Sequence, residues 1–189
     1  TSFPDAPRVD AAAGVASTLV ILVIDGARIE ETLGDGESDA WGDSTASIMP
    51  RLRSELLEAG AAFNPAYVTN DTVTTPSHAT LLTGVSQTFP PMSYSSRGEG
   101  LRQLDLPTLF EVARLSRGLD ADQVHLFANT MLLGDVTFSQ HPGYGAELGA
   151  TYTMVSMADA PDEPSEDDAD VVAGVRQALE DGAALVLGN

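Results

Sequence analysis

The sequence contains no cysteine and no lysine, and it has no long apolar run. The absence of cysteine excludes disulfides, zinc–thiolate sites and catalysis by a thiol. A membrane-spanning helix needs about 18 consecutive apolar residues, so no transmembrane segment is predicted. The N-terminal segment TSFPDAPRVDAAAG lacks a basic region followed by an apolar stretch, and a signal peptide is therefore not expected. We expect residues 1–16 to form a flexible leader.

Basic residues are scarce. The sequence has nine arginines and 28 acidic residues, which gives a formal net charge of −19. Such a surface repels nucleic acids and anionic lipids, so we expect no nucleic-acid-binding surface. Solubility is the simplest explanation of the charge. A small anionic substrate can bind only where metal ions or a helix terminus reverse the local field.

Apolar strands alternate with amphipathic helices along the 189 residues. This alternation predicts an α/β fold with a mostly parallel sheet and helices on both faces. The aliphatic run 17–26, STLVILVIDG, is typical of a strand buried on both faces. Residues 85–104 and the acidic stretch 159–170 are predicted to be loops. The other expected strands are 61–69, which Pro65 limits to an edge or a bulge, 123–129 and 183–189; the expected helices are 48–60, 106–118 and 167–182.

Asp25 follows the first strand directly. Ligands of open parallel sheets bind beyond the carboxyl ends of the strands, so this position suits a metal-binding carboxylate. The alternative is a turn residue, because Asp-Gly is also a common turn sequence.

The segment 68–84, VTNDTVTTPSHATLLTG, contains six threonines and reads as a loop that enters a short helix. Pro76 suits the first helical position and Thr75 the N-cap, which predicts a helix over 76–83 closed by Gly84. Thr74 then faces the positive end of that helix. A threonine hydroxyl needs a base or a cation to become a nucleophile, and Asp25 could hold the cation. The alternative is that these threonines only cap the helix.

Two motifs together resemble the alkaline phosphatase superfamily: LVILVIDGAR (19–28), and TTPSHATLLTG (74–84) about fifty residues later. This superfamily includes phosphodiesterases, nucleotide pyrophosphatases, phosphonoacetate hydrolase, cofactor-independent phosphoglycerate mutases and sulfatases. The resemblance implies that Asp25 is a metal ligand, and that Thr74 is both the nucleophile and a metal ligand. The residues that match the helix positioning this nucleophile are Pro76, Ser77, His78, Thr83 and Gly84.

The resemblance implies a hydrolase of phosphate mono- or diesters that acts through a phosphothreonine intermediate. It further implies two divalent metal ions, zinc first with manganese or calcium as alternatives, a small anionic phosphoester substrate and an extracytoplasmic location. Threonine cannot become the formylglycine of sulfatases, and phosphoglycerate mutases of this group use serine. Both of these relatives are therefore kept only as alternatives.

The sequence departs from the family pattern after Gly84, where VSQTFPPMSYSSRG lacks the His-Gly pair and asparagine of phosphodiesterase-like members. Arg97 or a nearby serine could hold the phosphate instead, unless Arg97 is only an exposed loop residue. The three histidines do not match the spacing of the family's later ligands. We expect His78 to pack beside the nucleophile, His125 to lie in the core and His141 to lie in a loop.

The family's later ligands would follow the strand that ends at Asn189. We therefore expect residues 17–189 to form the N-terminal part of one catalytic domain, completed by a C-terminal remainder and inactive alone. A member of the family that serves a binding or structural role without catalysis is the competing hypothesis.

Overall fold

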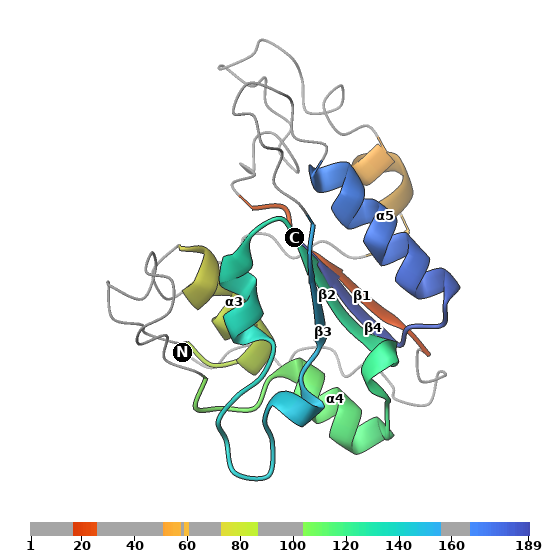
Figure 1. Cartoon of the computed structure of the whole chain (residues 1–189). Coiled ribbons are helices and arrows are strands. Elements are labelled where there is room, and N and C mark those ends of the chain that lie inside the picture. Colours follow the sequence, from red (N-terminus) through yellow and green to blue (C-terminus); the bar gives the residue numbers. More distant parts are fainter. Residues whose placement is uncertain (1–16, 26–50, 58, 61–72, 87–103, 156–166) are drawn as a thin grey trace, which may run out of the picture.

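The computed structural model describes residues 17–25, 51–57, 59–60, 73–86, 104–155 and 167–189. Its centre is a four-stranded sheet in the order β1-β4-β2-β3, in which every pair of neighbours is parallel. The strands are β1 (Leu19–Leu22), β2 (Val124–Ala128), β3 (Thr151–Met154) and β4 (Leu185–Gly188). The chain therefore has the α/β architecture predicted from the alternation of its elements (Figure 1).

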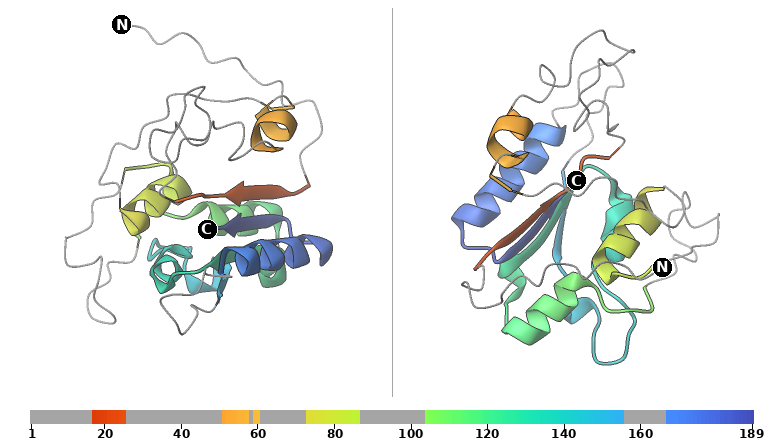
Figure 2. Two further views of the ribbon diagram at one scale, coloured as in Figure 1. Left: turned by 90° about the horizontal axis from the view of Figure 1, so that it is seen from above. Right: turned by 180° about the vertical axis from the view of Figure 1, so that it is seen from behind.

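Helices cover both faces of the sheet. One face packs against α3 (Thr74–Thr83) and α4 (Leu109–Arg117), and the other packs against α5 (Asp167–Glu180) (Figures 1 and 2). The two cores follow from the alternation of side chains along a strand. Leu185 and Leu187 enter the core under α3 and α4, whereas Val186 between them enters the core under α5.

Five predicted elements lie where the sequence places them. They are β1 within 17–26, α4 within 106–118, β2 within 123–129, α5 within 167–182 and β4 within 183–189. Strand β3 was not predicted, although its alternating sequence Thr-Tyr-Thr favours a strand. The sequence analysis also missed the 3₁₀ segments η3 (Ala121–Gln123), η4 (Met131–Val136) and η5 (Ala146–Leu148).

The described helices are short, and the longest, α5, has 14 residues. Among these helices, none is long and apolar enough to cross a membrane.

The prediction that the strand in 17–26 is buried on both faces is wrong. β1 lies at the end of the described sheet and pairs with β4 alone. Its residues are largely exposed, and Leu22 retains 62% of its accessible surface. The apolar composition of this run therefore reflects its place in a parallel sheet, but it does not determine whether neighbours cover the strand.

The helix expected over 48–60 is only partly described, and its described residues form a π-helix, η1 (Leu52–Leu57). An amphipathic α-helix is stabilised mainly by burying its apolar face. Leu56 is 63% exposed, so this residue of the expected apolar face makes little contact with the core. The expected strand 61–69 and most of the loop 85–104 lie outside the described residues, as do residues 156–166 of the acidic region.

A buried carboxylate ties the start of α4 to a distant loop. Glu111 and Thr108 form a reciprocal capping box: Thr108 N donates to Glu111 Oε2 at 2.7 Å, and Glu111 N donates to Thr108 Oγ1 at 3.3 Å. Glu111 Oε1 accepts from Ser139 N, Ser139 Oγ and Gly145 N at 3.0, 2.9 and 2.8 Å. The carboxylate is completely buried and accepts only from uncharged donors, a pattern that fixes the loop against the helix.

Replacing Glu111 by Gln should destabilise the protein by about 3 kcal/mol. The amide would turn one acceptor oxygen into a donor that faces other donors, in a fully buried site. Urea unfolding followed by circular dichroism measures the change. The control is Glu147→Gln on exposed η5, which should change the free energy of unfolding by less than about 0.5 kcal/mol. Equal effects of the two substitutions would show that Glu111 is not an anchor.

Candidate functional site

Three polar residues follow the carboxyl ends of neighbouring parallel strands: Asp25 after β1, Asn189 after β4 and Asn129 after β2. Backbone hydrogen bonds continue past the ends of the strands, because Val23 N donates to Gly188 O at 2.9 Å and Asn189 N donates to Phe127 O at 3.0 Å. The Asn189 side chain adds a bond to Val23 O at 3.3 Å. These bonds gather the three residues at the edge where open α/β sheets bind ligands.

Helix α3 brings the fourth member of the site. Thr74, its first residue, donates from Oγ1 to Asp25 Oδ2 at 3.0 Å. The two residues are 49 positions apart in the sequence and belong to different elements. The structure therefore brings together the two side chains that the sequence analysis selected as nucleophile and metal ligand.

The predicted start of this helix is wrong by two residues. The N-cap is Val73 rather than Thr75, and Thr75 is a buried residue of the first turn. Pro76 is accommodated at the third helical position because the first N–H donors of a helix have no partner within it. The first bond indeed comes from Ser77 N, which donates to Val73 O. The predicted end is confirmed, since Gly84 adopts the left-handed conformation with φ of 71°.

A pocket of about 680 Å³ contains the Asp25–Thr74 pair. It also contains Asp168 from the first turn of α5, and Asn129 Nδ2 donates to Asp168 Oδ1 at 3.2 Å.

Asn129 and Asn189 could have been selected by the rule that selected Asp25, since both follow predicted strands. Nothing in the sequence indicates that Asp168 belongs to the pocket. It lies in the first turn of α5, and only the packing of this helix on the sheet brings that turn to the edge of the sheet. The lining residues are Leu22, Val23, Ile24, Asp25, Thr74, Asn129, Thr130, Asp168, Val171, Val172, Gly188 and Asn189.

The Asp25–Thr74 pair places two oxygen donors close together. Zinc binds carboxylate oxygens at about 2.0–2.2 Å, and two ligands of a tetrahedral site lie about 3.4 Å apart. The separation between Asp25 Oδ2 and Thr74 Oγ1 is 3.0 Å, the length of their hydrogen bond. Within the described ranges, no group of three or more histidine, cysteine, aspartate or glutamate residues is placed to hold a metal. The pair by itself offers two oxygen atoms, fewer than the four ligands of a tetrahedral zinc site.

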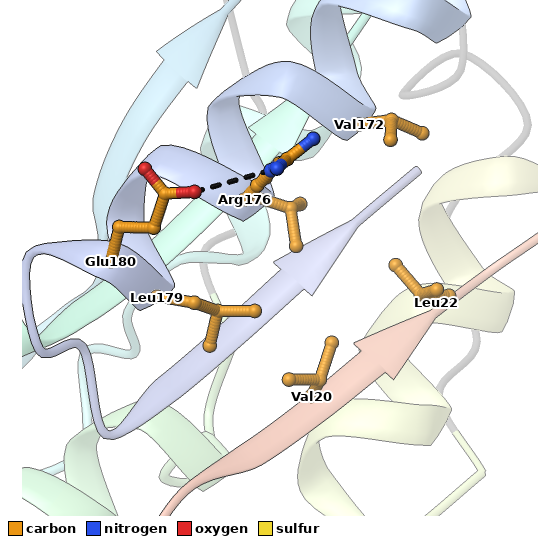
Figure 3. A pocket seen from close by; sticks show the side chains of 7 residues that line it. Val20, Leu22, Val172, Arg176, Leu179 and Glu180 are labelled. Atoms are coloured by element: carbon orange, nitrogen blue, oxygen red, sulfur yellow. Dashed lines mark hydrogen bonds and ion pairs between the residues drawn. The ribbon is translucent and has the colours of Figure 1, made fainter.

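A second hollow lies beside the first, between β1 and α5 (Figure 3). Its walls are aliphatic, and its charged groups are Arg176 and Glu180, which pair at 3.1 Å across one turn of α5. Figure 3 shows Val20 and Leu22 on β1 facing Val172 and Leu179 on the helix. The hollow offers no polar group directed at a reacting atom, so the candidate site is the polar pocket at the strand ends.

The remaining residues selected from the sequence do not join this site in the described structure. Arg97 lies outside the described residues. His125 is in β2 as expected, but it is only half-buried, stacks on Phe127 at 5.7 Å and belongs to the rim of the core. His141 lies in a loop as predicted, near the ring of Tyr144.

Comparison of the chain with protein-family models, with curated proteins and with solved structures finds no match. The chain is an α/β protein whose described sheet is parallel throughout.

One wall of the pocket is held by a half-buried tyrosine. Tyr152 on β3 donates from its hydroxyl to Thr130 O at 2.6 Å, and Thr130 lines the pocket. Burial raises the pKa of Tyr152, and the charge of nearby Asp135 raises it further. Burial also raises the pKa of the Asp135 carboxyl above its usual value of 3.8.

The raised pKa of Asp135 predicts a pH-dependent effect of Asp135→Asn. Above pH 3.8 Asp135 ionises more readily in the unfolded chain than in the native state. Its ionisation therefore lowers the free energy of unfolding as pH rises. The asparagine variant should therefore melt at a higher temperature than the wild type at pH 7. This difference should shrink toward pH 3, as scanning calorimetry can measure. A difference that does not change with pH would contradict the assigned cause.

Proposed function

We propose that the protein is a metal-dependent hydrolase of phosphate mono- or diesters, of the alkaline phosphatase type, in which Thr74 is the nucleophile. The single observation that carries this proposal is the 3.0 Å hydrogen bond from Thr74 Oγ1 to Asp25 Oδ2 inside a pocket at the carboxyl edge of the sheet. The bond joins the two sequence motifs that resemble that superfamily, and it lies where α/β folds bind ligands.

The pocket geometry suggests how Thr74 would act. Its hydroxyl proton points at Asp25, so the lone pairs of Oγ1 remain available to a phosphorus atom. Attack of Oγ1 forms the Oγ1–P bond and breaks the bond from phosphorus to the leaving oxygen. The hydroxyl proton passes along its hydrogen bond to Asp25 Oδ2 and then to solvent, and the leaving group departs as an alcohol after taking a proton from solvent. Water then cleaves the phosphothreonine, which releases phosphate or a phosphate monoester and restores the hydroxyl.

Asp25 and Thr74 are the residues that would hold a divalent cation, zinc first. A cation bound there would lower the pKa of the threonine hydroxyl and neutralise charge that develops on the phosphoryl oxygens. Asp25 holds the threonine in one orientation by its hydrogen bond. The first-turn amides of α3, which receive no side-chain cap, favour an anionic group beside Thr74.

The electrostatics of the pocket explain why a cation is needed. Among the residues that the structure describes, its lining includes Asp25 and Asp168 and no lysine, arginine or histidine. Two carboxylates would repel a phosphoester in a protein whose net charge is −19. Bound cations would reverse this field and admit an anionic substrate.

In the full-length protein, replacing Thr74 by Ala should reduce hydrolysis of p-nitrophenyl phosphate and bis-p-nitrophenyl phosphate by at least about a thousandfold, because the attacking atom is lost. Thr74→Ser, which keeps the hydroxyl, should retain measurable turnover. The matched control is Thr80→Ala in the same helix, which should keep turnover near that of the wild type. Turnover in Thr74→Ala equal to that of the control would exclude Thr74 as the nucleophile.

Replacing Asp25 by Asn should lower the zinc bound per chain, since the amide is a weaker ligand than the carboxylate. Equilibrium dialysis followed by elemental analysis measures bound zinc without requiring turnover. Asp181→Asn, a change at an exposed position after α5, is the control for loss of one surface charge. Equal zinc content in the two variants would remove Asp25 from the metal site.

A further inference from the structure

His78 lies one helical turn after Thr74 and is almost completely buried, with 3% of its surface exposed. Its Nδ1 is 2.8 Å from the carbonyl oxygen of Thr74. A carbonyl oxygen can only accept, so Nδ1 is the donor in this bond. The hydrogen bond therefore fixes the tautomer of the imidazole and aims its proton at the backbone of Thr74.

The other ring nitrogen makes no compensating bond. Nε2 of His78 is buried and has no hydrogen-bond partner among the residues that the structure describes. A buried acceptor without a hydrogen bond lowers the stability of the folded state by about 1–3 kcal/mol. An aliphatic side chain of similar size would avoid this cost. The hydrogen bond from Nδ1 to Thr74 O is therefore what histidine adds at this position, because a leucine could fill the space but could not donate this bond.

Thr74 needs such support because its helix has no side-chain cap. Val73 occupies the N-cap position, and no side chain there receives a bond from the first-turn amides. Thr74 is instead held at two points: Asp25 accepts from its hydroxyl, and His78 donates to its carbonyl oxygen. The first bond orients Oγ1, and the second fixes the backbone from which Oγ1 projects.

We propose that His78 is a positioning residue for Thr74, acting through its Nδ1–H group and not through Nε2. This inference rests on the proposed function of Thr74, since positioning matters to a nucleophile that must meet phosphorus in line. A displacement of the attacking atom by about 1 Å can cost about a hundredfold in rate. His78 would thus affect the chemical step without touching the substrate.

Two conservative variants separate the two ring nitrogens. In His78→Asn the side-chain NH₂ takes the place of Nδ1 and can still donate to Thr74 O. In His78→Gln the amide reaches the place of Nε2, and the donor at Nδ1 is lost. Steady-state kinetics with bis-p-nitrophenyl phosphate should show kcat within about threefold of the wild type for the asparagine variant. The glutamine variant should lose about tenfold to a hundredfold in kcat with KM nearly unchanged.

A measurement that needs no turnover keeps this inference separate from the proposed function. Long-range ¹H–¹⁵N correlation spectra of the wild type should show the proton of His78 on Nδ1. Amide hydrogen exchange should accelerate at the start of α3 in the glutamine variant and not in the asparagine variant, while the Leu82 amide is unchanged in both. If the full-length protein shows no turnover, the hydrolase proposal fails while these spectra still report the contact. A proton on Nε2, or equal kinetics and exchange in the two variants, would overturn the role of His78.

Discussion

The described structure depends on the position of β4 between β1 and β2. This strand is paired on both sides, and all four of its residues are buried. Its alternate side chains belong to the two cores, so one strand joins α3 and α4 on one face to α5 on the other. Loss of this pairing would separate β1, and Asp25 with it, from the rest of the sheet.

Because every described pair of strands is parallel, their carboxyl ends meet at one edge. This arrangement gathers Asp25, Asn129 and Asn189, which are far apart in the sequence, around the start of α3. The pocket that results combines aliphatic walls with two carboxylates, whereas the neighbouring hollow between β1 and α5 is almost wholly aliphatic. Leu22 lines both of them, because it lies at the end of β1 between the two.

In the proposed mechanism, two side chains act on Thr74 in different ways. Asp25 orients the hydroxyl of Thr74 and offers a cation ligand, while His78 holds the backbone of the same residue. Bound cations would reverse the field of the carboxylates and admit an anionic ester. A binding protein without catalysis would need the pocket but would not need Thr74 to be held at two points.

The sequence by itself determined the parallel α/β class, most helix and strand positions, and the choice of Asp25 and Thr74, since these depend on local periodicity and short motifs. It did not determine the exposure of β1, the N-cap at Val73, the entry of Asp168 into the pocket, or the bond from His78 to Thr74. Those features were decided by the tertiary structure. Burial, capping and proximity depend on which elements pack together, and side chains 49 residues apart acquire a 3.0 Å contact only when the sheet and α3 assemble.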